Sequence, residues 1–235
     1  MTVEHVMQQL QEMGNDTTKR IYQNHGATEP LFGVKIGDLK SLVKRIKTNH
    51  ELARELYATG NSDAMYLAVL IADPMQMTVE ELDAWAQKAY WYMLIEHAVA
   101  ALAAESPHAL PLARSWIRSD AEMIQAAGWA TYSGWLSIAD TAAIDIEELD
   151  KRLDHIRDHL HHSKNRVRYA MNNFVISVGG YVPELQDKAL DVAQALGAVQ
   201  VDMGGTACKV PSAPDYIRKM VERGSAQRKR KAVRC

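Results

Sequence analysis

The chain has 235 residues, of which 47% are apolar and 24% are charged, a globular composition that excludes a disordered body. It contains 32 alanines but only 7 prolines and 2 phenylalanines, which favours helices and argues against an all-β fold. The net charge of −2 is unevenly distributed, because residues 218–235 carry +7 and the preceding residues therefore carry −9. A basic end on an acidic body is typical of a nucleic-acid arm or of a solvated terminus.

Helical periodicity runs along almost the whole chain. In the segments 39–46, 149–160 and 185–196, apolar residues recur at intervals of three and four, the spacing of one helix face. Helix starts are expected at Thr78 and at Ser106, which a proline follows. The pattern predicts roughly eleven or twelve helices joined by short loops, and no pair of strands.

The predicted helices follow one another in pairs. The pairs recur at intervals of roughly 28 to 40 residues, the period of helical-hairpin solenoids. We therefore expect an all-α fold, an α-solenoid of stacked antiparallel hairpins with a concave groove, formed by residues 1–223 and followed by a basic tail, residues 224–235. The paired segments are 50–58 with 62–72, 78–88 with 91–104, 107–118 with 121–136, and 146–161 with 165–178.

The segment LFGVKIGDLK at residues 31–40, followed by Leu42-Val43-Lys44, resembles the N-terminal signature of the DNA alkylation repair family. These proteins are HEAT-like-repeat DNA glycosylases that remove cationic alkylpurines. Residues 50–73 are similar to the second helical pair of that family, and a weaker likeness covers most of the remaining body. The resemblance implies a C-shaped solenoid that grips double-stranded DNA on its concave face.

The catalytic set of that family is an aspartate, an arginine and two tryptophans. The resemblance places Glu96 in the position of the aspartate and Tyr92 in that of the first tryptophan, or Trp91 with a shift of one residue. Ala126 stands where the arginine is expected, and Asn173 where the second tryptophan is expected. Glu96 is therefore the candidate catalytic residue, and three of the four positions depart from the family pattern.

Glu96 lies in a very apolar segment, WYMLIEHAVAALAA. A buried carboxylate without a partner is costly, so this side chain is expected either to line the groove or to pair with His97 or an arginine.

Three functions remain open from the sequence. The first is DNA alkylation repair by base excision, with removal of cationic 3- or 7-alkylpurines, whose positive charge already makes them good leaving groups. The second is non-catalytic binding of duplex or branched DNA by a HEAT-repeat protein. The third is a protein-interaction scaffold without a nucleic-acid role. Salt dependence separates the third from the other two, because binding through several phosphates weakens steeply with salt.

The candidate DNA-binding residues are basic, aromatic or amide side chains on the predicted helices and in the tail. Basic and amide groups at the start of the helix near 165 suit phosphate oxygens, whereas a tryptophan at helix spacing is more often a core residue. The candidates are Lys35, Lys40, Lys44, Arg45, Tyr92, Trp129, Arg166, Arg168, Asn173, Lys229 and Arg230.

Two other patterns carry weaker signals. His155, His159 and His162 fall on one helix face beside aspartates, but this spacing alone rarely binds a metal, and a solvated polar face is expected. The segment Gly204-Gly205-Thr206 lacks the strand and the GK[ST] spacing of a nucleotide loop, so a plain turn is expected. We predict no metal site and no nucleotide cofactor.

The same sequence predicts a cytoplasmic monomer that has no membrane partner. The longest apolar run, residues 64–72, is far shorter than the roughly 20 residues that a membrane span needs. The first residues lack the basic start and apolar core of a signal peptide. Two cysteines, Cys208 and Cys235, form neither a disulfide framework nor a zinc site, which fits a reducing compartment.

Overall fold

The computed structural model of the chain describes residues 1–226 and 228–234. Within these ranges every regular element is a helix, which confirms the expected all-α fold. The first eight α-helices are α1 (Val3–Met13), α2 (Asp16–Asn24), α3 (Ile36–Ile46), α4 (His50–Ala58), α5 (Ser62–Ile71), α6 (Val79–Lys88), α7 (Ala100–Glu105) and α8 (Ala109–Trp116). The others are α9 (Glu122–Ile138), α10 (Ile146–His159), α11 (Asn165–Tyr181), α12 (Gln186–Leu196) and α13 (Ala213–Glu222).

Four short elements of other helix types join these α-helices. A π-helix, η1 (Met93–Val99), runs directly into α7, so the predicted helix over 91–104 has two different windings. Three single-turn 3₁₀ segments precede α10, α11 and α12, and these are η2 (Thr141–Ala143), η3 (Leu160–His162) and η4 (Pro183–Leu185). Because π-helical turns recur at functional sites, the winding of η1 marks the segment that contains Glu96.

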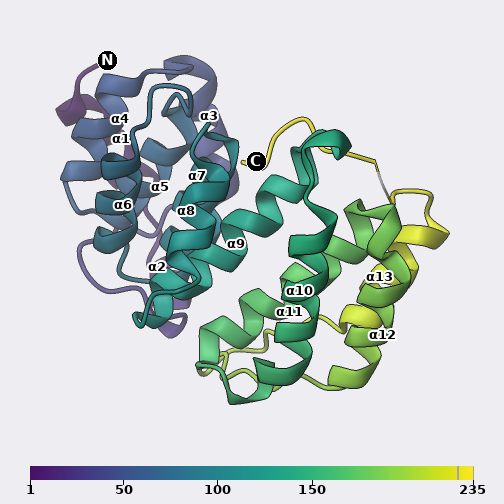
Figure 1. The fold of residues 1–235 in the computed structure, drawn as a ribbon. Coiled ribbons are helices and arrows are strands. Elements are labelled where there is room, and N and C mark those ends of the chain that lie inside the picture. The colour runs from purple at the N-terminus through teal and green to yellow at the C-terminus, as the bar shows by residue number, and fades with distance from the viewer. Residues whose placement is uncertain (227, 235) are drawn as a thin grey trace.

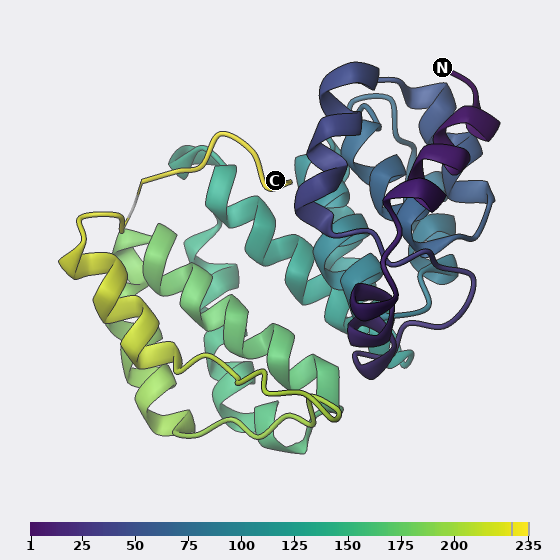
Figure 2. The same cartoon turned by 180° about the vertical axis from the view of Figure 1, so that it is seen from behind.

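The helices form two halves with separate hydrophobic cores. One core gathers apolar residues from Val6 to Ala127, and the other gathers residues from Ala113 to Ile217. Helix α9 contributes to both, with Ile124 in the first core and Trp129 in the second. Figure 1 and the reverse view in Figure 2 show α9 running between the N-terminal helices and the green and yellow C-terminal helices. Helix α9 therefore joins the two halves, because it is part of both cores.

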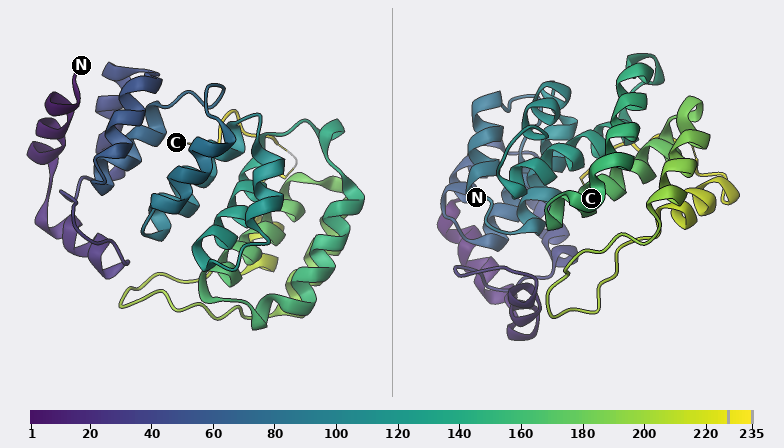
Figure 3. Two further views of the ribbon diagram at one scale, coloured as in Figure 1. Left: turned by 60° about the vertical axis from the view of Figure 1, so that its left-hand side comes forward. Right: turned by 60° about the horizontal axis from the view of Figure 1, so that its bottom comes forward.

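A second connection between the halves is the loop that joins α12 to α13. Figure 3 shows this loop leaving the C-terminal half and extending toward α2. Its Cys208 sulfur lies 4.0 Å from Nε2 of His25, in the residue that follows α2. The segment Gly204-Gly205-Thr206 is part of this loop and forms a turn in which the Gly204 N–H donates to Asp202.

Of the two predicted helix starts, one is observed at the predicted residue. Thr78 caps α6, and its hydroxyl accepts the Glu81 N–H while the Glu81 carboxylate accepts the Thr78 N–H. Such a reciprocal capping box satisfies two otherwise unpaired donors. The expected start at Ser106 is displaced, because α8 begins at Ala109 and Ser106 instead ends α7. The Ser106 hydroxyl accepts the His108 N–H, so it stabilises the turn between the two helices.

The segment 31–40, which carries the family signature, is held by a buried aspartate from α5. The Asp63 carboxylate accepts the N–H groups of Phe32, Gly33 and Val34 at 2.6, 3.1 and 2.8 Å. Gly33 has a φ of +82°, and a Cβ atom there would lie 2.5 Å from the Lys19 nitrogen. Only glycine fits this crossing of the chain over α2. Gly33 of the signature, and Asp63 that holds the segment, therefore have structural roles.

Candidate nucleic-acid interface

A hollow of about 270 Å³ lies on the face between the two halves. Its walls come from η1, α9 and α11, and its rim includes the C-terminal segment. The lining side chains are mostly neutral and polar, and they include His97, Ser133, Asn173, Ser177 and Tyr181. Glu96 also lines this hollow. The structure thus places three of the predicted site residues, Glu96, Asn173 and Arg230, around one hollow.

An ion pair at the edge of the hollow joins η1 to α11. The Arg166 Nε and Nη2 atoms each donate to one carboxylate oxygen of Glu96 at 2.7 Å. Glu96 is 7% exposed and Arg166 is 9% exposed. The guanidinium also lies 4.3 Å from the ring centroid of Tyr92 and 4.6 Å from that of Tyr169. Of the alternatives expected for Glu96, the structure shows both a pairing with an arginine and a place in the wall of the hollow.

The protonation state of this pair determines the charge that Glu96 presents to a ligand in the hollow. Burial raises the pKa of Glu96, and the bidentate hydrogen bonds and charge of Arg166 act in the opposite direction. A two-pronged pairing at this distance favours the ionised carboxylate and the charged guanidinium together. Because both carboxylate oxygens accept hydrogen bonds from the same cation, the pair presents no net charge to a ligand in the hollow.

His97 contributes a neutral ring beside this pair. Desolvation lowers the pKa of His97 to about 4, and the positive charge of Arg166 contributes to the same shift. The imidazole is exposed in the groove and is uncharged at neutral pH. It therefore offers hydrogen bonds to a ligand and no positive charge.

Tyr92 and Trp91 occupy different environments. Tyr92 is half-buried, and its hydroxyl forms a 2.9 Å hydrogen bond with Nδ1 of His25. Trp91 is 4% exposed, and its Nε1 donates to the Ser62 hydroxyl. Tyr92 is therefore the residue that borders the site, while Trp91 belongs to the core of the N-terminal half. Ala126, which stands where the arginine of the family is expected, is fully buried.

Two of the predicted DNA contacts are buried inside the protein. The expectation for Trp129 is wrong, because its side chain is fully buried and lies edge-to-face against Phe174 in the core of the C-terminal half. The apolar periodicity of α9 carries this residue into the core. Arg166 is likewise not at the surface, because its guanidinium is enclosed by Glu96 and two tyrosine rings. Neither side chain is therefore placed to contact DNA.

The basic residues of the α3 region do lie at the surface. Lys35, Lys40, Lys44 and Arg45 are all exposed. Lys40 and Lys44 share a pocket with Ala232 and Arg234 of the C-terminal segment, so this helix face borders the region between the halves. Arg45 donates to Gln9.

The remaining basic candidates lie on α11 and in the C-terminal segment. Arg168 is half-buried and its Nη2 donates to Asn165. Lys229 and Arg230 lie in a segment that is docked on the body, with the Lys229 ammonium donating to the carbonyl oxygens of Leu136 and Tyr181. The sequence predicts a basic tail over residues 224–235, but its composition does not predict that Lys229 and Arg230 dock on the body.

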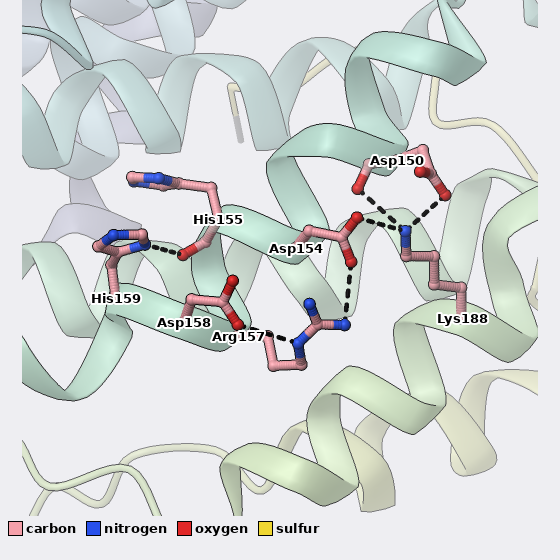
Figure 4. Close-up of polar contacts among 7 residues, drawn as sticks. All are labelled: Asp150, Asp154, His155, Arg157, Asp158, His159 and Lys188. Atoms are coloured by element: carbon pink, nitrogen blue, oxygen red, sulfur yellow. Dashed lines mark hydrogen bonds and ion pairs between the residues drawn. The ribbon is translucent and has the colours of Figure 1, made fainter.

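The histidine face of α10 is an ion-pair network (Figure 4). The Lys188 ammonium contacts Asp150 at 2.6 Å and Asp154 at 3.0 Å. Arg157 pairs with Asp154 and Asp158, so cations already occupy these carboxylates. The rings of His155 and His159 stack with their centroids 4.4 Å apart. In the ranges that the structure describes, no group of three His, Cys, Asp or Glu side chains is placed to hold a metal ion.

Two residues that shape the site escaped prediction from the sequence. Glu105 anchors the C-terminal segment, and its position at the end of an alanine-rich helix was the available signal. His25, which holds the Tyr92 hydroxyl, stands alone in a polar stretch and gave no signal.

Among the described residues, no helix is both long and apolar enough to span a membrane.

Comparison with known proteins places this architecture in a family. Residues 6–206 match the model of the family described as DNA alkylation repair enzyme. The uncharacterized proteins Lmo0209 of Listeria monocytogenes and Lin0241 of Listeria innocua are each 36% identical over 225 residues, covering 93% of this chain and 97% of theirs.

A solved structure superposes on the whole chain. It has a TM-score of 0.91 and 41% sequence identity, covers 100% of both chains, and is described as a new family of proteins related to the HEAT-like repeat DNA glycosylases with affinity for branched DNA structures. The expected HEAT-like solenoid is thereby confirmed, and this chain belongs to the DNA alkylation repair enzyme family.

Proposed function

We propose that this protein binds branched DNA along the face between its two halves and does not excise bases. The observation that carries the proposal is the bidentate pair in which Arg166 occupies both carboxylate oxygens of Glu96. A solved relative that is 41% identical has affinity for branched DNA structures, which supports the choice of ligand. We infer that the protein acts as a monomer in the cytoplasm, which suits a DNA ligand and a chain with two cysteines.

The absence of excision follows from what the site lacks. The resemblance implies that catalysis in this family needs a carboxylate facing the positive sugar, with an arginine and two tryptophans around it. Here Glu96 is neutralised by Arg166, while Ala126 and Asn173 stand at the arginine and second tryptophan positions. The loss of each preorganised electrostatic contact costs about 10²–10³ in rate. Two such losses bring excision close to the spontaneous rate.

The surface supports DNA binding through its exposed cations. Lys40 and Lys44 project from α3, and the hollow between the halves offers neutral hydrogen-bonding groups such as Asn173 and Ser177. Phosphate contacts of this kind position a duplex without reading its sequence. A branch point presents phosphates from two duplexes at once, so both halves of the protein can contact DNA together.

Anisotropy titrations of a labelled four-way junction and a linear duplex with the same arm sequence test the proposal. We expect tighter binding of the junction, with an affinity that falls steeply between about 50 and 200 mM salt. Lys40→Ala should weaken binding to both DNAs and reduce the salt slope by about 1. Lys151→Ala serves as the matched control, because Lys151 is exposed on α10 and pairs with Glu147.

Two results would contradict the proposed function. Binding that is absent, or that does not respond to salt, would favour the protein-interaction scaffold. Equal affinity for the junction and the duplex would remove the preference for branched DNA.

A further inference from the structure

Residues 228–234, which we call the strap, cross from the C-terminal half to the N-terminal half. Figures 1 and 2 show this yellow segment passing over the end of α9 toward the N-terminal helices. Exposed basic tails are ordinarily solvated, but polar contacts fix both ends of this one. Specific contacts with the folded body therefore determine the course of the strap.

The first anchor joins the strap to the C-terminal half. The Lys229 ammonium donates to the Leu136 carbonyl at 2.8 Å and to the Tyr181 carbonyl at 3.1 Å. The Arg230 N–H donates to the Ser137 carbonyl at 2.7 Å. These carbonyls belong to the last turns of α9 and α11, where acceptors have no partner within the helix and the helix dipole attracts a cation.

The second anchor joins the strap to the N-terminal half through Glu105. Its Oε1 atom accepts the N–H groups of Val233 and Arg234 at 2.7 and 2.8 Å, and its Oε2 atom accepts Nε of Arg234 at 2.8 Å. The Arg234 Nη1 atom donates to the carbonyls of Val69 and Ala72 at the end of α5. The side chains of Arg234 and Glu105 are 14% and 12% exposed, so this anchor is largely shielded from solvent.

At its second anchor, the strap also packs against the C-terminal part of α9. A Cβ atom at Gly134 would lie 3.0 Å from Cγ1 of Val233, so a glycine makes room for this contact. Arg230 lines the hollow and also a second cavity, which His97, Val233 and Arg234 share. The strap therefore forms part of the wall of the proposed DNA-binding face.

The strap also changes the charge of this face. It contains five basic residues and no acidic one, and Arg228, Arg230 and Lys231 are exposed. Among the described residues that line the hollow, Arg230 is the one basic side chain besides the neutral His97. At its far end the strap shares a pocket with Lys40 and Lys44 of α3. Docking thus extends the basic face of α3 across a groove whose own walls carry few cations.

We propose that the docked strap is itself the central phosphate-binding element of this face, with duplex DNA near a branch point as its ligand. The inference rests on the proposed function and adds to it the segment that holds the DNA. A segment ordered before binding loses less conformational entropy on association than a free arm does. The Glu105 anchor is therefore needed for affinity although Glu105 itself is negative.

One substitution tests this inference by whether it tightens or weakens DNA binding. Glu105→Gln removes a negative charge, which by charge alone should tighten DNA binding. If docking supplies the affinity, the released strap should instead weaken junction binding, by roughly tenfold when about two to three phosphate contacts are lost. Glu147→Gln is the matched control, because Glu147 is 80% exposed on α10 and pairs with Lys151. It removes the same charge and should leave binding unchanged or slightly tighter.

Hydrogen exchange at the amides of Val233 and Arg234 reports docking separately from DNA binding. We expect protection of both amides in the wild type, loss of protection in Glu105→Gln, and an unchanged thermal unfolding midpoint for the body. Tighter junction binding by Glu105→Gln than by Glu147→Gln would overturn the inference, because the strap would then be a lid that DNA displaces. Equal binding by the two variants would overturn it as well. Wild-type protein that binds no DNA would instead contradict the proposed function.

Discussion

Replacing Asp63 by alanine should destabilise the protein by about 4 kcal/mol or more. Its carboxylate accepts the N–H groups of Phe32, Gly33 and Val34, and Asp63 is 4% exposed. A hydrogen bond to a charged group contributes about 1.5–3 kcal/mol. A buried N–H group that loses its acceptor has also given up its hydrogen bonds to water without replacement, which adds to the cost. The expected loss is a large part of the roughly 5–15 kcal/mol that stabilises a typical domain.

Urea unfolding followed by circular dichroism measures this effect. Asp38→Ala is the matched control, because Asp38 is exposed in the first turn of α3 and its interaction with the helix dipole contributes about 0.3–1 kcal/mol. Similar losses in the two variants would show that Asp63 does not hold the segment that carries the family signature.

Replacing Arg166 by methionine should destabilise the protein by about 3–5 kcal/mol at neutral pH, because it leaves the buried Glu96 carboxylate without its partner. The loss should shrink as the pH falls. Burial already raises the pKa of Glu96, and without Arg166 the folded-state pKa lies above the unfolded value. Protonation then favours the folded state, so the stability of the variant is greatest below the unfolded pKa and declines as the pH rises toward the folded pKa.

A double variant separates the ion pair from its packing. Arg166→Met combined with Glu96→Leu removes both charges and should recover much of the lost stability, because apolar side chains often replace a buried ion pair at little cost. It should also lose the pH dependence of the single variant. Losses that simply add in the double variant, measured by urea unfolding at several pH values, would contradict a coupled pair.

The helices could be predicted because the sequence carries their periodicity and caps locally. The hairpin of α4 and α5 lies at the expected positions, and Thr78 begins α6 through the contacts that its side chain makes within three residues. The expected start at Ser106 failed because a serine before proline also suits a turn between helices, and the local signal does not separate the two.

The site could be predicted only in part, because its contacts join residues far apart in the chain. The apolar surroundings of Glu96 indicated that it needs a partner, but the choice of Arg166 depends on how α11 packs beside η1. The position of Trp129 could not be predicted for a different reason, since an aromatic residue at helix spacing fits both a core and a binding face. The strap could not be foreseen, because its anchors are mostly backbone carbonyls, which have no sequence signature.

We propose that this family member binds DNA although Arg166 neutralises the carboxylate at its candidate catalytic position. The most direct measurement is release of 7-methylguanine and 3-methyladenine from alkylated DNA, at protein concentrations at which the same DNA is shown to be bound. We expect release at the spontaneous rate for the wild type and for Glu96→Gln alike. Protein-dependent release by the wild type that Glu96→Gln abolishes would contradict this proposal, because Glu96 would then act on the sugar despite its pairing with Arg166.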